Sequence, residues 1–329
     1  MTQLHLPPFY KGQETFSIKA SALPWHITDV KLDSYWPHTC AGAGILVGVA
    51  DTGIDETHPD IAGRIRWAQA FVRRRGRADR VDDGNGHGTH VATTIATMAP
   101  NAEFAIAKVL ADNGSGSNRG VATGIRALAD QGCHIINLSL GGPYDDPDTR
   151  DAVDYAKRAG CLVFVATGNE NANAVGFPAQ HAVGVGAVGR DRKLAWFSNR
   201  GKNVDIVGYG VEIIAGVPGG TWQEMSGTSM ATPWIAGIAA NRLSAELKHR
   251  GEVYTNSDAR LLELETFVTD LGPAGRDTSY GRGMPDLAAV LNLAEPEPEP
   301  AGDAPSYKLS IFADGKPREA EGTFRELEQ

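Results

Sequence analysis

Short apolar runs rich in β-branched residues recur along the chain and alternate with helix-like segments. The runs are GILVGVA (44–50), EFAIAKVL (103–110), HIINLSL (134–140), CLVFVAT (161–167) and AVGVGAV (182–188). Two of the segments between them, 120–132 and 148–160, have helical spacing and end in glycine, and the second starts with Asp148 as its expected N-cap. This alternation predicts an α/β protein with three layers, α/β/α, around a mainly parallel sheet.

Polar and small residues follow several of these runs directly. Asp51 follows the first run, Ser139 lies at the end of the third, and Gly168 and Asn169 follow the fourth. Functional residues of such sheets collect at the carboxyl ends of the strands. We therefore expect these residues to lie near one another at one edge of the sheet.

The stretch SGTSMATPW (226–234) precedes a long run with helical spacing that stops at Gly251. Proline is tolerated only in the first turn of a helix, so Pro233 predicts a helix start near residues 228–230. Ser229 then lies at the positive end of the helix dipole.

Charge and cysteine usage exclude some classes of protein. The net charge of −9 and a pI near 5.5 make nucleic acid an unsuitable partner. Three widely spaced cysteines do not suggest a disulfide framework. No apolar stretch has transmembrane length and the N-terminus lacks a signal-peptide pattern, so we expect a soluble, cytoplasmic protein without a membrane partner. The oligomeric state is left open.

Three side chains that can act together are set among small residues: Asp51 in VADTGID, His87 in NGHGTHVA and Ser229 in SGTSMATP. A serine hydroxyl becomes nucleophilic only when a positioned imidazole takes its proton and a carboxylate orients that imidazole. Taken singly, each residue has an ordinary reading as a turn or cap residue. His87 and His90 also resemble half of a zinc site, but no matching third ligand is apparent.

Taken together and in order, the motifs DTGID…HPD, NGHGTHVA, NLSLGG, ATGN and SGTSMATP resemble those of the subtilisin-like serine proteases (subtilases, peptidase S8 type) over roughly residues 25–294. The resemblance implies a subtilisin-like fold and a serine endopeptidase that requires no cofactor. It implies that Asp51 orients the imidazole, that His87 acts as general base and then acid, and that Ser229 is the nucleophile, its hydroxyl facing His87. Asn169 matches the family's oxyanion-hole asparagine, which acts beside the Ser229 N–H.

The resemblance also implies how peptide or protein substrates bind. Two backbone segments hold an extended peptide between them, and a primary pocket takes the side chain before the scissile bond. Gly176 at the pocket floor leaves room for a large apolar side chain, so we expect broad specificity with large apolar residues preferred at this position. Glu170 is expected at the rim, where its charge also favours a basic residue. The expected substrate-binding residues are Gly114, Ser115, Gly116, Ser139, Leu140, Gly141, Ala166, Gly168, Glu170 and Gly176.

The sequence departs from the family pattern at two places. Asp60 matches a ligand of the family's tight calcium site, but the loop that completes that site is missing between residues 98 and 99, so we expect this site to be absent. Another calcium site is left open. Trp234 stands where histidine is usual, and the sequence assigns it no function.

The expected organisation is an N-terminal extension (1–24), a catalytic domain (25–294), a Pro/Glu-rich linker (295–306) and a tail (307–329) with a possible short hairpin turning at Asp314-Gly315. It is closest to that of intracellular subtilisins, because the residues before Asp51 leave no room for a large prodomain. LHLPPFYKG (4–12) either lies along the cleft as an inhibitory strand or packs elsewhere. Both readings stay open.

Two rival functions use the same residues. One is an inactive scaffold that only binds, although the intact set of Asp51, His87, Asn169 and Ser229 argues against it. The other is an acyl hydrolase or transferase that acts on esters or on one dedicated precursor peptide.

Overall fold

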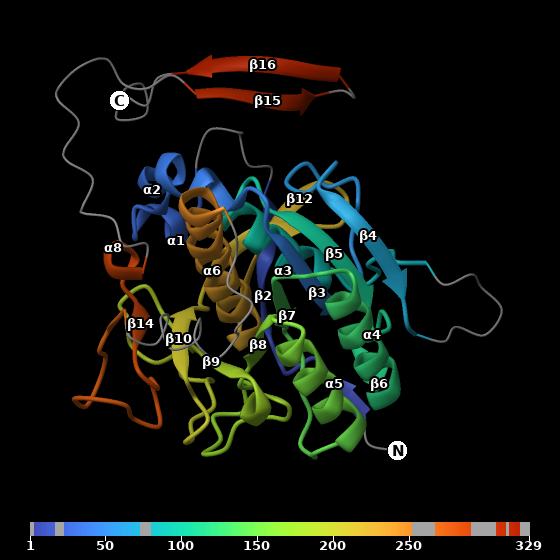
Figure 1. Ribbon diagram of the computed structural model, residues 1–329, viewed down its shortest axis with the longest axis vertical. Coiled ribbons are helices and arrows are strands. Elements are labelled where there is room, and N and C mark those ends of the chain that lie inside the picture. Colours follow the sequence, from blue (N-terminus) through green and yellow to red (C-terminus); the bar gives the residue numbers. More distant parts are fainter. Residues whose placement is uncertain are drawn as a thin grey trace.

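The computed structural model describes residues 3–16, 23–72, 80–251, 267–290, 307–313 and 316–322 (Figure 1). The expected linker at 295–306 and the turn at Asp314-Gly315 lie outside these described residues.

A seven-stranded parallel sheet forms the centre of the molecule, in the strand order β10-β9-β8-β7-β3-β5-β4. The five apolar runs are the five inner strands, as predicted. The sequence analysis did not single out β4 and β10, the two edge strands, because β4 reads IRWAQA without a continuous apolar run and β10 is only four residues long. The strands are β3 (Leu46–Asp51), β4 (Ile65–Ala70), β5 (Glu103–Lys108), β7 (Ile135–Leu138), β8 (Leu162–Ala166), β9 (Val183–Val188) and β10 (Ile206–Tyr209).

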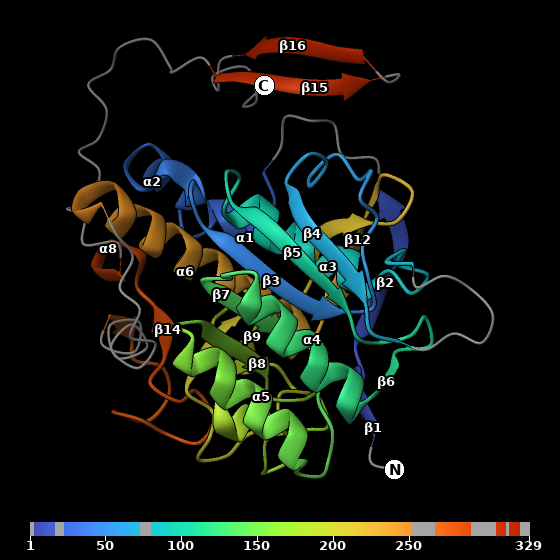
Figure 2. The same cartoon turned by 45° about the vertical axis from the view of Figure 1, so that its right-hand side comes forward.

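Helices cover both faces of this sheet, which confirms the three-layer α/β/α fold. One core cluster joins α3 (His87–Met98) and α6 (Thr228–Arg250) to one face through β3 residues such as Val47 and Val49. The other joins α4 (Asn118–Asp130) and α5 (Pro147–Arg158) to the opposite face. Figure 2 shows α4 and α5 side by side across the sheet.

The start of α5 corrects one predicted cap. Asp146, not Asp148, is the N-cap, and its side chain accepts a hydrogen bond from Thr149 N at 2.9 Å. Pro147 then occupies the first helical position, where its missing N–H costs nothing. Asp148 lies in the first turn instead, where its charge still favours the helix dipole.

The helix α6 begins at Thr228, within the predicted range, and ends at Arg250, before Gly251, whose φ is +74°. Pro233 is the sixth residue of the helix, so it lies inside α6 and not in the first turn, where the sequence placed it. Trp234 is fully buried on this helix. Its indole Nε1 donates to His26 O at 3.2 Å, and its ring lies 5.2 Å from the ring of Tyr209. Trp234 therefore packs α6 against α1 (Trp25–Thr28) and β10.

The N-terminal segment, defined here as residues 3–16, joins two smaller sheets. Its first strand, β1 (Gln3–His5), pairs antiparallel with β6 (Ser115–Ser117). Its second strand, β2 (Tyr10–Phe16), pairs antiparallel with β12 (Thr221–Ser226), which in turn pairs with β11 (Ile213–Val217). The N-terminal segment therefore connects β6 to β12, through one strand paired with each.

The remaining described elements are peripheral. In the tail, β15 and β16 pair antiparallel from Tyr307↔Gly322 to Ala313↔Lys316. Among the described helices, none combines the length and the apolar character of a membrane span. The peripheral elements are α2 (Leu32–Thr39), η1 (Cys40–Gly42), η2 (Ala179–His181), β13 (Val268–Thr269), β14 (Met284–Pro285), α8 (Leu287–Val290), β15 (Tyr307–Ala313) and β16 (Lys316–Gly322).

Candidate active site

Asp51 and His87 form a fully buried pair. Asp51 is the last residue of β3, and His87 is the first residue of α3. The ring atom Nδ1 of His87 donates to Asp51 Oδ1 at 2.8 Å, and Thr52 N donates to the same oxygen at 2.7 Å. A carboxylate only accepts, so Nδ1 carries the proton and Nε2 is left as a base.

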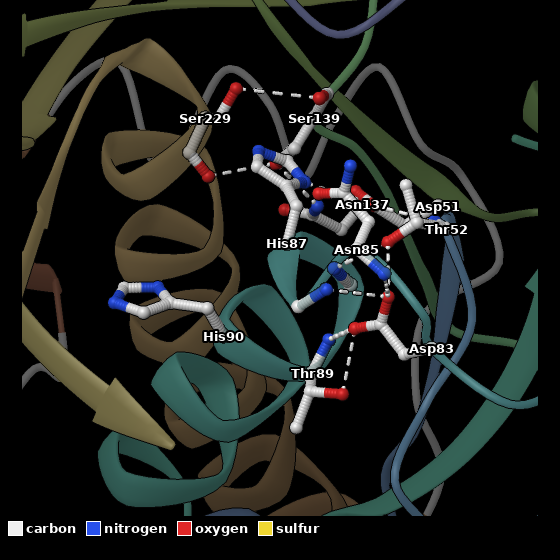
Figure 3. Close-up of polar contacts among 12 residues, drawn as sticks. Asp51, Thr52, Asp83, Asn85, His87, Thr89, His90, Asn137, Ser139 and Ser229 are labelled. Atoms are coloured by element: carbon white, nitrogen blue, oxygen red, sulfur yellow. Dashed lines mark hydrogen bonds and ion pairs between the residues drawn. The ribbon is translucent and has the colours of Figure 1, made fainter. Parts of the chain in front are cut away.

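A second carboxylate, Asp83, fixes the two elements that carry this pair. Its Oδ1 accepts from Thr52 Oγ1 at 2.8 Å and from Gly86 N at 2.9 Å, and its Oδ2 accepts from Thr89 N at 2.8 Å. Thr52 Oγ1 in turn accepts from Gly88 N at 2.9 Å. These bonds tie the end of β3 to the first turn of α3, as Figure 3 shows.

Ser229 lies beside this pair at the start of α6, and in Figure 3 the His87 ring lies between Ser229 and Asp51. Its carbonyl oxygen accepts from Ser139 Oγ at 2.9 Å, which links the end of β7 to α6. Its hydroxyl donates to Ser139 O at 3.3 Å, rather than to His87 as the sequence analysis expected. Within the described chain, His87 Nε2 has no hydrogen-bond partner.

The side chain of Asn169 is oriented by the residue before Ser229. Both N and Oγ1 of Thr228 donate to Asn169 Oδ1 at 2.8 Å. Because its oxygen is occupied, the amide presents Nδ2 to the cleft, and this nitrogen donates to Pro8 O at 2.5 Å. A donor aimed at a carbonyl oxygen is the arrangement that an oxyanion hole requires.

The residues expected to form the primary pocket lie at and after the end of β8. Ala166 ends this strand, and a side chain at Gly176 would approach nothing closer than Thr167 O at 3.6 Å. Gly168 has a φ of +104°, and a Cβ there would lie 2.3 Å from Asn199 Nδ2, so only glycine fits. Glu170 at the rim accepts from the same Asn199 nitrogen at 2.6 Å.

The two backbone segments expected to bind a substrate, 114–116 and 139–141, hold the start of the N-terminal segment between them. On one side, Leu4 pairs with Gly116 and His5 with Ser115, and Leu6 N donates to Gly114 O at 3.0 Å. On the other side, His5 and Gly141 exchange two backbone bonds of 2.9 Å. Leu4 is buried as well, in the core cluster that contains Leu140.

The segment then crosses the candidate centre. After Pro8, whose carbonyl meets Asn169, the ring of Phe9 lies 4.8 Å from the ring of His87. The next residue, Tyr10, lies 4.8 Å from Trp196 and 5.4 Å from Phe197 and pairs with Ser226 of β12. Residues 4–10 therefore follow the whole cleft, which is one of the two readings left open by the sequence.

No group of three or more histidine, cysteine or acidic side chains in the described chain is arranged to hold a metal ion. His90 points away from His87 in Figure 3, and its Nε2 donates to Ile213 O and Gln223 O. Asp60 accepts from Trp222 Nε1 at 2.6 Å, so its carboxylate has a structural partner.

Two residues around the centre were not anticipated from the sequence: Asp83 and Lys108. Buried Lys108 donates to Thr52 O and lies 2.9 Å from Asp112 Oδ1. Asp83 left no helix-start signal in the sequence, because it precedes the N-cap Gly86. Lys108 left none, because it lies within an apolar run.

Known proteins resemble most of this chain. The model of the Subtilase family matches residues 42–283. An alkaline protease of Alkalihalobacillus alcalophilus is 38% identical over 82% of this chain and 70% of its own length. Subtilisin Savinase of Lederbergia lenta is 37% identical over 82% of this chain and 99% of its own length, and Subtilisin E of Bacillus subtilis (strain 168) is 36% identical over 82% and 72%.

Proposed function

Because the chain belongs to the subtilase family and is a serine endopeptidase that acts on peptide or protein substrates, we propose that Asp51, His87 and Ser229 are its catalytic triad. The observation that carries this proposal is the 2.8 Å bond between Asp51 and His87, both fully buried, beside the serine that starts α6. The triad of subtilases has the chain order Asp, His, Ser, so finding this order here is not independent support for the proposal.

In the proposed mechanism, the Ser229 hydroxyl turns from Ser139 O to His87 Nε2 and loses its proton to that nitrogen as it attacks the peptide carbonyl. Asp51 keeps the proton on Nδ1 and stabilises the imidazolium. His87 then gives the proton to the leaving amine, which breaks the peptide bond and leaves an acyl-enzyme. Water hydrolyses the acyl-enzyme by the same steps.

The charge that develops on the carbonyl oxygen is stabilised by Asn169 Nδ2 and by the Ser229 N–H. The first turn of a helix has N–H groups without intrahelical partners, and the helix dipole adds to their effect on an anion. The contact between Asn169 and Pro8 O supports this role, since it already places a peptide carbonyl at the donor.

The absence of a side chain at Gly176, where a Cβ would already contact Thr167 O at 3.6 Å, supports a preference for large apolar residues before the scissile bond. The engagement of Glu170 by Asn199 reduces its availability to a basic side chain. Sequencing the products of a peptide library tests this preference. Strict selection of small or acidic residues at this position would contradict it.

The proposed function is tested by digestion of casein with the wild-type chain, with Ser229→Ala and with Tyr144→Ala as a matched control. Tyr144 is 66% exposed and is not one of the proposed site residues. We expect wild type and the control to release peptides and Ser229→Ala to release none. Turnover of esters without any cleavage of casein would favour the acyl hydrolase, and activity that survives in Ser229→Ala would contradict the triad.

We further propose that residues 4–10 inhibit the enzyme in its resting state. They occupy the substrate segments by strand pairing, and peptide binding by strand addition draws its affinity from these same backbone bonds. They also resist cleavage, because Pro7 and Pro8 have no N–H and Phe9 lies against the general base. Leu4→Ala in the full chain should raise the initial rate of peptide hydrolysis, and so should a truncation that starts at Ser21. An unchanged rate in both variants would contradict inhibition.

A further inference from the structure

The N-terminal segment marks a path that extends well beyond the catalytic centre. Counting from the carbonyl at Asn169, Phe9 is the first residue after the position of a scissile bond and Tyr10 is the second. Both the oxyanion-hole contact and the strand pairing fix the direction of a chain in this cleft. A substrate therefore leaves the centre over the residues that Tyr10 and its successors contact.

The first feature on this path is an aromatic platform made of Trp196 and Phe197, whose rings lie 5.5 Å apart. Trp196 is 68% exposed although Tyr10 already packs on it at 4.8 Å. Only three large hydrophobic side chains are classed as exposed in the described chain, and two of them, Tyr10 and Trp196, meet here. The packing of Tyr10 on these two rings shows that an aromatic side chain at the second position after the bond fits against them.

The second feature is the edge of β12. In the sheet order β11-β12-β2, this strand is flanked by β11 on one side and by the N-terminal segment on the other. Displacement of β2 leaves the backbone groups of residues 221–226 on an open edge, which is a template for another strand.

The fit between β2 and this edge is imperfect. Tyr10 and Lys11 pair with Ser226 and Met225, but the register then shifts, and the pairing resumes only at Thr15 with Gln223. Residues 12–14 therefore lie opposite the single residue Glu224. A strand without this bulge would pair its second to sixth residues after the scissile bond with Ser226 to Trp222 in order.

On the basis of the endopeptidase activity proposed above, we propose that the edge of β12 and the Trp196–Phe197 platform form an extended binding site for the part of an unfolded polypeptide that follows the scissile bond. Backbone pairing along residues 222–226 raises kcat/KM for substrates that have at least six residues after that bond. The platform selects an aromatic side chain at the second of them.

The test measures kcat/KM of the full chain with four fluorogenic peptides that share the residues before the scissile bond. Two peptides carry six residues after the bond, with tyrosine or alanine at the second position. A third carries only two residues, with tyrosine second, and a fourth repeats the long tyrosine peptide with prolines at the fourth and fifth positions. If the N-terminal segment blocks a fraction of the enzyme, kcat/KM falls by the same factor for all four peptides. The ratios of kcat/KM between peptides are therefore unaffected.

For the wild-type chain, we expect tyrosine to exceed alanine in kcat/KM by about three- to tenfold, the size of an aromatic pair contribution. We expect the long peptide to exceed the short one by about fivefold or more, and the two prolines to remove this gain because they cannot donate to a strand. Trp196→Ala should abolish the preference for tyrosine and keep the effect of length. Tyr144→Ala, which removes the third exposed aromatic, should keep both.

Equal rates for tyrosine and alanine in wild type would overturn the platform. Equal rates for the long, short and proline peptides would overturn the strand site. If no peptide is cleaved at all, the proposed activity fails instead. The same ratios are then measured as dissociation constants of the labelled peptides for the Ser229→Ala chain, and equal constants for all four would overturn the site itself.

Discussion

The amide of Asn169 is fixed in one orientation by its neighbours. Two donors of Thr228 hold its oxygen, so its nitrogen faces the carbonyl that enters the cleft. A donor that is oriented before the reaction loses nothing to reorganisation as charge develops. On the proposed role of Asn169, we therefore expect its removal to affect the transition state more than substrate binding.

We predict that Asn169→Ala lowers kcat by about 100- to 1,000-fold with little change in KM, because the lost bond strengthens only as the oxyanion forms. Steady-state kinetics with one peptide substrate measure both constants. The matched control is Asn173→Ala, which changes an exposed asparagine four residues away and should leave kcat unaltered. A rise in KM with unchanged kcat would assign Asn169 to ground-state binding.

Asp83 is a second single residue on which the candidate site depends, but it acts through other residues. It holds Thr52 and the first turn of α3, so it positions Asp51 and His87 without touching a substrate. We predict that Asp83→Asn lowers kcat about tenfold or more, because an amide has one acceptor oxygen for donors that now occupy two. Asp82→Asn, at a neighbouring carboxylate that is 63% exposed, should change neither kcat nor Tm. Unchanged kcat in Asp83→Asn would remove its positioning role.

At the level of elements, two histidines join α1 and α3 to the β11–β12 hairpin. His26 Nε2 lies 3.5 Å from Ile214 O, and His90 Nε2 lies 3.0 Å from Gln223 O. Both rings are fully buried. Burial lowers the pKa of His26 to about 4 and that of His90, which is also near His87, to about 3.

These shifts predict that stability falls as the pH falls. Between the unfolded pKa of 6.5 and the folded values, the unfolded chain binds protons that the folded chain does not. Each histidine then removes about 1.4 kcal/mol of the free energy of unfolding per pH unit, down to a pH of about 4. Urea titrations at pH 7.5 and 5 measure the change.

The variant His26→Gln isolates one of these histidines. The two histidines together contribute a part of the slope of the unfolding free energy against pH. The substitution should remove about half of that part. His249→Gln, at an exposed histidine, is the control and should leave the slope unchanged. A slope that is the same in all three proteins would contradict the assignment.

The elements predicted from the sequence are those whose signal is local. The five inner strands are continuous apolar runs because both of their faces are buried. The start of α6 was predicted near residues 228–230, but Pro233 lies inside the helix and so gave only an approximate position. The strands β4 and β12 were not predicted because their composition is mixed and most of their residues are only partly buried, and β10, although buried, is only four residues long. The cap of α5 was placed two residues late, since two aspartates flank Pro147 and local sequence does not rank them.

At the scale of the whole molecule, the site residues could be named from their motifs, but their contacts could not. Lys108 can donate to Thr52 O only because β5 and β3 are neighbours in the sheet. The route of residues 4–10 through the cleft likewise depends on partners more than a hundred residues away. Pairings of this kind leave no periodic trace in a single sequence.

The tight calcium site that the family places around Asp60 remains a prediction of absence for this chain. Asp60 accepts from Trp222, and the completing loop is missing from the sequence. We expect EDTA to leave the Tm unchanged in differential scanning calorimetry, because a ligand that stabilises the fold must bind it. A fall of many degrees would reveal a strong calcium site elsewhere in the protein.

We propose above that Ser229 is an activated nucleophile and that the chain's own N-terminal segment covers it. Labelling the full chain with a serine-directed fluorophosphonate, followed by peptide mass spectrometry, tests it most directly. We predict a label on Ser229 that forms faster in Leu4→Ala than in wild type and is lost in His87→Ala. Absence of label from Ser229 in both wild type and Leu4→Ala would contradict the claim.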